Sequence, residues 1–195
     1  ADIILTDLSE GMLAEARPAL EGDGRFTLRC MDASRLEFED ASFDFVTANH
    51  MLYHVPDIAQ ALAEVARVLK PDGAMMAATN GENYMLDLDL LLTEFWPDYG
   101  GLHTMSLKFN LENGAEQLSQ WFGIVEKKLY TGDLWVTEAQ PLVDYVYSTP
   151  RVQQMIPLDQ REAMRVFFQA RIDQADGILI RKETGLFLAS QPIKA

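Results

Sequence analysis

The chain has 195 residues, of which 48% are hydrophobic and 24% charged, as expected for a single globular domain with a sizeable core. Its net charge of −14 argues against binding to nucleic acid or to an anionic membrane surface, because both require clustered Lys and Arg. Cys30 is the only cysteine, so no intrachain disulfide can form, and no apolar run approaches the ~20 residues of a membrane span. We therefore expect a cytoplasmic protein with no membrane or nucleic-acid partner.

The first 79 residues alternate between strand-like and helical patterns. Ser9 is placed to cap a helix that runs to Leu20, and Asp57 is placed to cap a second helix that Lys70-Pro-Asp-Gly73 ends. Apolar runs of the buried-strand type surround these helices at residues 3–6, 26–31, 43–48 and 74–79. This order of strands and helices predicts a doubly wound α/β sheet.

Residues 80–122 form a long, aromatic-rich stretch with a helical pattern at 84–95 and a short helix within 111–122. Such a stretch is typical of a lid or substrate-binding insertion, although a pair of helices that only covers the sheet explains it equally well. Further along, the pattern predicts a strand at 123–130 and helices at 137–147 and 159–175. Two apolar runs that flank Lys182-Glu-Thr-Gly185 predict a C-terminal antiparallel hairpin.

Two acids follow successive strands of the predicted sheet. Asp7 ends the first strand and Asp32 follows the second. Because the carboxyl ends of parallel strands share one edge of a sheet, both carboxylates can face one ligand, and an acid at such a position typically binds ribose hydroxyls. The other explanation for each acid is a cap on a tight turn. The Gly-rich turn that usually precedes such an acid is absent.

Four motifs stand in order along residues 1 to about 80: Thr6-Asp-Leu-Ser9, Met31-Asp-Ala33, Phe43-Asp44 leading to Ala48-Asn-His50, and Arg67-Val-Leu-Lys-Pro-Asp-Gly73. In order and spacing they resemble the class I S-adenosylmethionine-dependent methyltransferases of the small-molecule type. The resemblance implies a Rossmann-like doubly wound sheet and S-adenosylmethionine as cofactor. It also implies in-line methyl transfer to a small molecule, with S-adenosylhomocysteine as product.

The resemblance also assigns roles to individual residues. Asp7 matches the acid that binds both ribose hydroxyls, and Met12 matches a residue that packs on the adenine or ribose, although core packing explains Met12 equally well. Asp32 matches the acceptor for the adenine amino group, the Ala33 amide matches a donor to a ring nitrogen, and Asn49 matches the residue beside the sulfonium. The cofactor-binding residues implied in this way are Asp7, Leu8, Met12, Asp32, Ala33, Asn49, His50 and His54.

His50 and His54 lie four residues apart and could share a helical face. No Glu joins them in a His-Glu-x-x-His pattern, so we predict no metal site. His50 or Tyr53 is a candidate general base on a substrate hydroxyl or amine, whereas His54 fits a structural position near the cofactor edge.

The chain departs from the family because the first strand and its Gly-rich loop are missing. Without that central strand, the second and fourth family strands would each have an unpaired edge or pair differently. We therefore expect the full-length protein to have a longer N-terminal region, or a partner chain that fills the gap. We also expect the 195-residue chain alone to bind cofactor poorly.

Two other functions compete with methyl transfer: a non-catalytic binding or interaction domain, and a nicotinamide-dependent oxidoreductase. For a methyltransferase, Tyr84, Trp96 and His103 are the candidate substrate-pocket residues, together with Phe95, Tyr99 and Trp121. The substrate, the accepting atom and the oligomeric state, including a homodimer, stay open.

Overall fold

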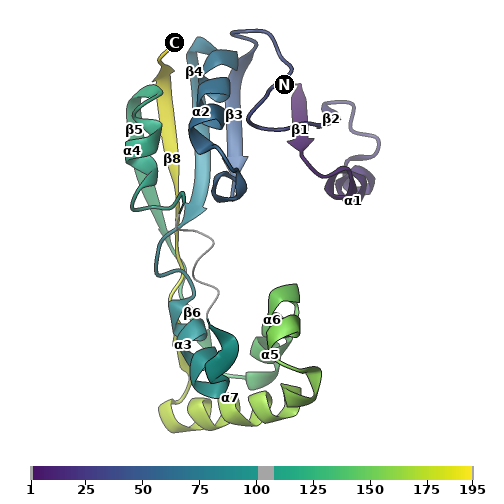
Figure 1. Ribbon diagram of the computed structural model, residues 1–195, viewed down its shortest axis with the longest axis vertical. Helices are drawn as coiled ribbons and strands as arrows, with labels where there is room; N and C mark the ends of the chain where they lie inside the picture. The colour runs from purple at the N-terminus through teal and green to yellow at the C-terminus, as the bar shows by residue number, and fades with distance from the viewer. Residues whose placement is uncertain (1, 101–107, 195) are drawn as a thin grey trace. The chain divides into compact units, whose positions relative to one another are not determined.

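The computed structural model describes residues 2–100 and 108–194 (Figure 1). The chain divides into two compact units. The first unit contains Ala1–Ala78, Asn113–Lys127 and Phe187–Ala195, and the second contains Thr79–Glu112 and Lys128–Leu186.

The first unit begins with a strand–helix–strand segment. Strand β1 (Ile3–Asp7) pairs in parallel with β2 (Phe26–Cys30), in a register that runs from Ile3 opposite Phe26 to Asp7 opposite Cys30. Helix α1 (Glu10–Leu20) connects them, and the Ser9 hydroxyl caps it by accepting from the Met12 amide at 3.3 Å. The predicted cap and both strands are thus confirmed.

A four-stranded sheet contributes the rest of the first unit's strands, in the order β3-β4-β8-β5. Its members are β3 (Phe43–Asn49), β4 (Leu69–Asn80), β8 (Glu183–Pro192) and β5 (Phe122–Thr131). Strand β3 is parallel to β4, and Figure 1 shows β8 running in the opposite direction to both. β4, β5 and β8 each contribute residues to both units.

Helix α2 (Ile58–Val68) connects β3 to β4, and the Asp57 side chain caps it as predicted. Its apolar face is buried, with Ala61, Leu62, Val65 and Ala66 each at most 6% exposed. Burial of this face explains why the apolar spacing located the helix correctly. The short helices of this unit are η1 (Leu52–His54) and α4 (Gly114–Leu118). Helix α4 is the short helix that the sequence predicts within residues 111–122.

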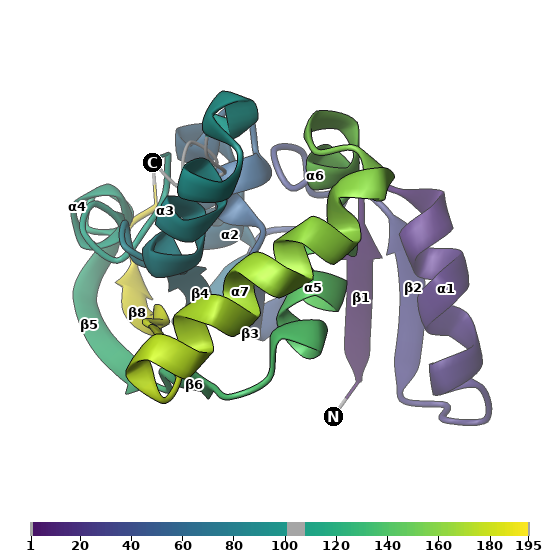
Figure 2. The ribbon, with the colours of Figure 1, turned by 90° about the horizontal axis from the view of Figure 1, so that it is seen from below.

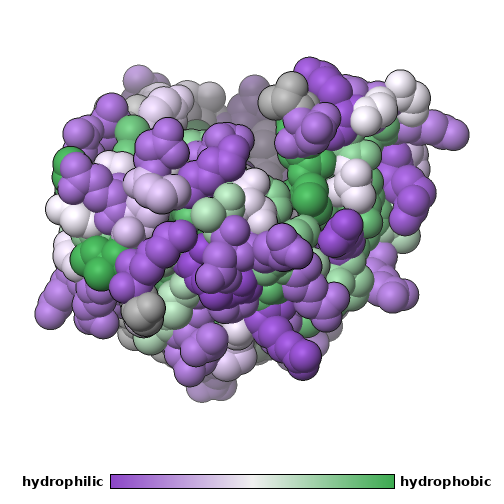
Figure 3. Space-filling model, turned by 90° about the horizontal axis from the view of Figure 1, so that it is seen from above, coloured by the Kyte–Doolittle hydropathy of each residue, from purple (hydrophilic) through white to green (hydrophobic). Residues whose placement is uncertain are grey.

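Each of the two sheets in this unit has an unpaired edge. Among the described residues, β1 pairs only with β2 and β3 pairs only with β4, which agrees with the expectation for a sheet without its central strand. Both strands expose apolar side chains: Ile3 is 40% exposed, Leu5 36% and Phe45 49%. Figure 2 shows β1 and β3 as separate strands, and Figure 3 shows hydrophobic surface along the side of a notch in the face seen from above.

The second unit is mainly helical. Its elements are α3 (Leu86–Phe95), η2 (Pro97–Tyr99), β6 (Leu134–Val136), α5 (Ala139–Tyr147), α6 (Pro150–Met155), η3 (Leu158–Gln160), α7 (Arg161–Ala175) and β7 (Ile178–Ile180). Tyr99, Val143, Ile156 and Phe168 are fully buried in one core cluster of this unit. The helices predicted at 84–95, 137–147 and 159–175 are present with small shifts, whereas β6 and α6 were not predicted.

The predicted C-terminal hairpin is wrong. Strand β7 pairs antiparallel with β6, with Leu134 opposite Ile180, and β8 lies between β4 and β5. Two local contacts account for the difference. Arg181 binds the Asp87 carboxylate through its guanidinium at 2.6 Å, and a Cβ at Gly185 would lie 2.5 Å from the Lys128 carbonyl oxygen. Gly185 therefore allows a close approach between β8 and the backbone of β5.

Candidate functional site

The two acids singled out by the sequence lie at neighbouring strand ends in the first unit. Asp7 is the last residue of β1, opposite Cys30 of β2. The Met31 amide donates to the Asp7 carbonyl oxygen at 2.9 Å, and Asp32 follows directly. This hydrogen bond fixes the two acids at one edge of the parallel pair. The geometry is the one that the strand-end argument predicts.

Each acid uses one carboxylate oxygen to hold a turn. Asp7 Oδ1 accepts from the Ser9 amide at 2.7 Å, and Asp32 Oδ1 accepts from the Ser34 amide at 2.8 Å. Within residues 2–100 and 108–194, neither Oδ2 atom accepts a hydrogen bond. The turn interpretation thus accounts for the Oδ1 atom of each carboxylate. The Oδ2 atom can accept a hydrogen bond from a ligand hydroxyl or amino group.

Apolar side chains next to Asp7 are exposed. Leu8 is 71% exposed and Met12, on the first turn of α1, is 56% exposed. The core-packing interpretation of Met12 is therefore wrong, because Leu13 fills the core position at 6% exposure. Two exposed apolar side chains beside a carboxylate form a surface suited to the flat face of a base or sugar.

The end of β3 carries the next polar residues. Asn49 is its last residue, opposite Ala78 of β4, and the His50 amide donates to the Ala78 carbonyl oxygen at 3.0 Å. His50 has a φ of 51°, in the left-handed region that non-glycine residues seldom adopt. Strained backbone of this kind clusters at functional sites. Both side chains are exposed at the carboxyl end of the strand.

The prediction that His50 and His54 share a helical face is wrong. Helix η1 covers only Leu52–His54, and His50 lies outside it with a left-handed backbone. The ring of His54 instead lies against the ring of Tyr53, with 4.5 Å between ring centroids. Within the described ranges, no group of three or more His, Cys, Asp or Glu side chains is arranged to hold a metal ion.

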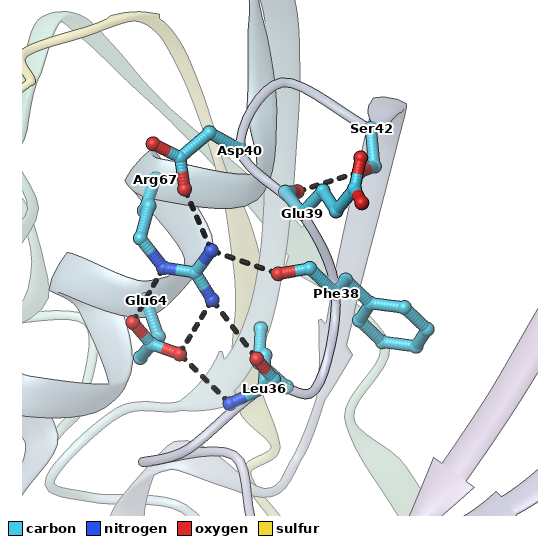
Figure 4. A network of polar contacts seen from close by, with 7 residues as sticks. All are labelled: Leu36, Phe38, Glu39, Asp40, Ser42, Glu64 and Arg67. Carbon is cyan, nitrogen blue, oxygen red and sulfur yellow. Dashed lines mark hydrogen bonds and ion pairs between the residues drawn. The ribbon is translucent and has the colours of Figure 1, made fainter.

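One feature beside Asp32 was not found from the sequence. Glu64 and Arg67 of α2 hold the connection between Ala33 and β3 by hydrogen bonds to its backbone (Figure 4). The Arg67 guanidinium keeps the pKa of the Glu64 carboxyl below its usual value. The signal was present as a Glu-x-x-Arg spacing on α2, but the contacts themselves span 27 to 31 residues along the chain.

The second unit contains four of the candidate substrate residues: Tyr84, Phe95, Trp96 and Tyr99. Tyr84 and Trp96 are half-buried, and Trp96 packs against the core cluster. Phe95 also packs there, and Tyr99 is fully buried with its hydroxyl donating to Asp89 at 3.1 Å. Trp121 is half-buried in the first unit, and His103 lies outside the described residues. All the proposed cofactor residues lie in the first unit, with Asp7 and Asp32 at one edge of the β1–β2 pair and Asn49 and His50 at the end of β3.

Comparison with known families places the methyltransferase motifs in the first part of the chain. Residues 1–77 match the family model described as methyltransferase domain. Demethylmenaquinone methyltransferase of Clavibacter sepedonicus is 42% identical over 76 residues, which cover 39% of this chain and 31% of the relative. Phosphoethanolamine N-methyltransferase 2 of Caenorhabditis elegans is 36% identical over 80 residues, covering 40% of this chain and 18% of the relative. The chain thus spans about a third or less of the length of these relatives.

Solved structures extend the similarity to the whole chain at the level of the fold. A putative methyltransferase from Bacillus halodurans superposes with a TM-score of 0.63 at 19% identity, covering 99% of this chain and 84% of that one. Haemonchus contortus phosphoethanolamine N-methyltransferase 2, in complex with S-adenosyl-L-methionine, gives a TM-score of 0.57 at 19% identity. The superposition covers 98% of this chain and 44% of that one. The resemblance to class I small-molecule methyltransferases and the Rossmann-like α/β fold are confirmed. In the part of the chain that the structure describes, no helix is long and apolar enough to cross a membrane.

Proposed function

We propose that this chain uses S-adenosylmethionine to methylate a small molecule. The observation that carries the proposal is the pair of strand-end carboxylates of Asp7 and Asp32. They are joined through the Met31 amide, and each has one oxygen available to a ligand. The match of residues 1–77 to a methyltransferase domain supports the same function.

In this proposal the two acids bind different parts of S-adenosylmethionine. Asp7 accepts from the ribose hydroxyls, while Asp32 accepts from the adenine amino group and the Ala33 amide donates to a ring nitrogen. Leu8 and Met12, both exposed beside Asp7, pack on the base or sugar. Asn49 and His50, at the end of β3, lie on the methionine side, and His54 lies near the cofactor edge.

The chemistry needs little from the protein beyond positioning. The methyl group passes from sulfur to the lone pair of an acceptor in line with the breaking bond, and S-adenosylhomocysteine leaves. Holding the reactants in this geometry can supply about 7–11 kcal/mol of the barrier. His50 or Tyr53 takes a proton from the acceptor where the acceptor is a hydroxyl or an amine.

The acceptor in this proposal is a small molecule bound by the aromatic stretch at 80–122, which serves as a lid or substrate-binding insertion of a single methyltransferase domain. Tyr84, Trp96 and His103 are the proposed pocket residues. Relatives named for menaquinone and phosphoethanolamine methylation support a small-molecule acceptor, although they differ in the acceptor itself. We also propose a cytoplasmic location from the acidic composition, and we leave a homodimer as one of two oligomeric states to be measured.

The test is isothermal titration of S-adenosylhomocysteine into the 195-residue chain and into the longest natural form of the protein, each with Asp7→Ala in parallel. We expect micromolar binding by the longer form and weaker binding by the 195-residue chain. Asp7→Ala should weaken the binding by roughly 1.5–3 kcal/mol, the value of lost charge-assisted hydrogen bonds. Binding only by the longer form would agree with the unpaired edges of β1 and β3.

NAD is titrated as the control ligand. Binding of NAD without S-adenosylhomocysteine would favour an oxidoreductase instead. A folded protein that binds neither ligand in either form would refute methyl transfer and leave a non-catalytic binding domain.

A further inference from the structure

The loop that connects β2 to β3 contains Asp32 and Ala33, and it has no helix or strand between Met31 and Ser42. At its start the Met31 amide is bound to the carbonyl oxygen of Asp7. At its end the amides of Ala41 and Ser42 donate to the carbonyl oxygens of Arg67 and Val68, at 3.0 and 2.8 Å. The contacts that hold the middle of this loop therefore contribute to the placement of Asp32 and Ala33.

The Arg67 guanidinium binds the middle of the loop at three points (Figure 4). Nη2 donates to the Leu36 carbonyl oxygen at 2.9 Å, and Nη1 donates to the Phe38 carbonyl oxygen and to Asp40 Oδ1, both at 2.8 Å. Irregular backbone has no ladder of its own, so these carbonyl groups depend on side-chain donors or water. The planar guanidinium of Arg67, with its fork of N–H donors, therefore supplies hydrogen bonds to this backbone that a helix or strand would otherwise supply.

Glu64 completes the arrangement from one turn earlier on α2. Its Oε2 accepts from the Leu36 amide at 2.8 Å, while Oε1 accepts from Arg67 Nε at 2.7 Å. The Glu64 side chain is 15% exposed and the Arg67 side chain 32%. Their mutual hydrogen bond raises the pKa of Arg67 and lowers that of Glu64, so both groups carry full charge near neutral pH. Leu36 is thus held through both its amide and its carbonyl, four residues after Asp32.

We propose that Arg67 is a positioning residue for recognition of adenine, acting through the loop that carries Asp32 and Ala33. The inference rests on the proposed function, because it takes those two residues as the adenine contacts. The anchors at Met31 and Leu36 leave only a short segment between them, and Arg67 fixes the second anchor together with Glu64, which it orients. Without its fork the loop can shift while α2, β2 and β3 stay in place.

The test compares two ligands that differ at the adenine amino group and in the proton on the ring nitrogen beside it. S-Adenosylhomocysteine and S-inosylhomocysteine, which has an oxygen in place of the amino group, are titrated into wild type, Arg67→Lys and Arg67→Met. We expect Arg67→Met to weaken S-adenosylhomocysteine roughly tenfold or more, the scale of charge-assisted hydrogen bonds, and to weaken the inosyl ligand much less. Arg67→Lys keeps the positive charge but not the planar guanidinium. It should therefore recover only part of the preference for S-adenosylhomocysteine over S-inosylhomocysteine.

Arg165→Met is the matched control, because Arg165 pairs with Glu162 at the same three-residue spacing on α7 and in the second unit. It should leave both affinities unchanged. An equal loss for both ligands in Arg67→Met would overturn the proposal, since a merely structural role lowers affinity without changing the preference for the amino group.

Hydrogen exchange without any ligand gives a second readout. The amides of Ser34 and Leu36 should exchange faster in Arg67→Met and Arg67→Lys than in wild type, and unchanged exchange would overturn the proposal. If neither the 195-residue chain nor the longer form binds S-adenosylhomocysteine with Arg67 intact, the proposed function fails at that step, and the adenine role of Arg67 fails with it. If only the inference about Arg67 is wrong, the wild-type protein still binds S-adenosylhomocysteine.

Discussion

Beside the strand-end acid Asp7 the first unit exposes apolar side chains, whereas a cluster of large side chains in the second unit is fully buried. Leu8 and Met12 are more than half exposed beside Asp7, while Tyr99 and Phe168 in the second unit have no exposed surface. Exposed apolar groups next to carboxylates contribute little to folding. In the proposed function these exposed side chains contact the cofactor, whereas the buried side chains of the second unit stabilise its core.

Selected ion pairs from the two units also differ in what they bind. In the first unit, Arg67 and Glu64 bind the backbone of an irregular loop. In the second unit, Arg161 and Arg165 bind the exposed carboxylates of Asp144 and Glu162, where solvent weakens the interaction. Stability and ligand affinity should therefore respond to different substitutions in the two units.

The largest effect is expected for Phe168→Ala in α7 of the second unit. Phe168 is fully buried in the core cluster, so its truncation leaves a cavity and should lower the free energy of unfolding by about 3–5 kcal/mol. Chemical denaturation followed by circular dichroism measures the change. Val166→Ala, on the same helix at a 55% exposed position, is the control and should change stability by less than about 0.5 kcal/mol. Similar losses in both variants would contradict the assignment of the core.

Local signals in the sequence located the elements of the first unit well. Ser9 and Asp57 cap the two helices as predicted, and Asp7 and Asp32 end up at one sheet edge, because caps and strand ends depend on neighbouring residues. Strand pairing was harder to predict. The hairpin assigned to β7 and β8 is wrong because β7 pairs with β6, more than 40 residues earlier, and a strand of three residues has too short a pattern to be found.

The candidate site shows the same limit. The sequence indicated the acids but could not reveal that Arg67 holds the loop between them and β3, since its donors reach carbonyl groups 29 and 31 residues away. Nor could it show that Met12 is exposed and Leu13 buried, because both fit the apolar pattern of α1.

A second prediction concerns Asp32. Asp32→Ala should weaken S-adenosylhomocysteine by about 1.5–3 kcal/mol, because a charge-assisted hydrogen bond to the adenine amino group is lost. Asp23→Ala is the matched control: Asp23 also accepts from an amide two residues on, that of Arg25 at 3.1 Å, but it precedes β2 instead of following it. Calorimetric titration of both variants separates ligand binding from loss of a turn. Equal weakening by the two substitutions would assign Asp32 to the turn alone.

A smaller effect is expected for Met12. Met12→Ala should reduce cofactor affinity by about 0.3–1.5 kcal/mol, the range of sulfur–aromatic contacts, and leave the free energy of unfolding nearly unchanged. Leu13→Ala should do the opposite, with a loss of about 2–5 kcal/mol in stability, because Leu13 is 6% exposed. Titration and denaturation of the pair test whether neighbouring residues of α1 serve ligand and core separately. Destabilisation by Met12→Ala would place it in the core after all.

The smallest effect concerns pH and the Glu64–Arg67 pair. Arg67 lowers the pKa of Glu64 below its ordinary value of 4.5, so the folded state holds this carboxyl ionised more readily than the unfolded chain does. The resulting stability, at most about 1 kcal/mol, is complete above the unfolded pKa and is lost as pH falls through the folded pKa. Glu64→Gln should therefore lower the free energy of unfolding relative to wild type at pH 7. In acid, the difference in stability between Glu64→Gln and wild type should become smaller. The midpoints of urea unfolding at neutral and acidic pH measure both differences. Glu162→Gln removes a pair of the same spacing whose carboxylate is 71% exposed, and solvent screening should make its pH effect smaller. If both variants respond alike, binding to the loop backbone adds nothing to the Glu64–Arg67 pair, and the contrast between the two units in their charged groups disappears.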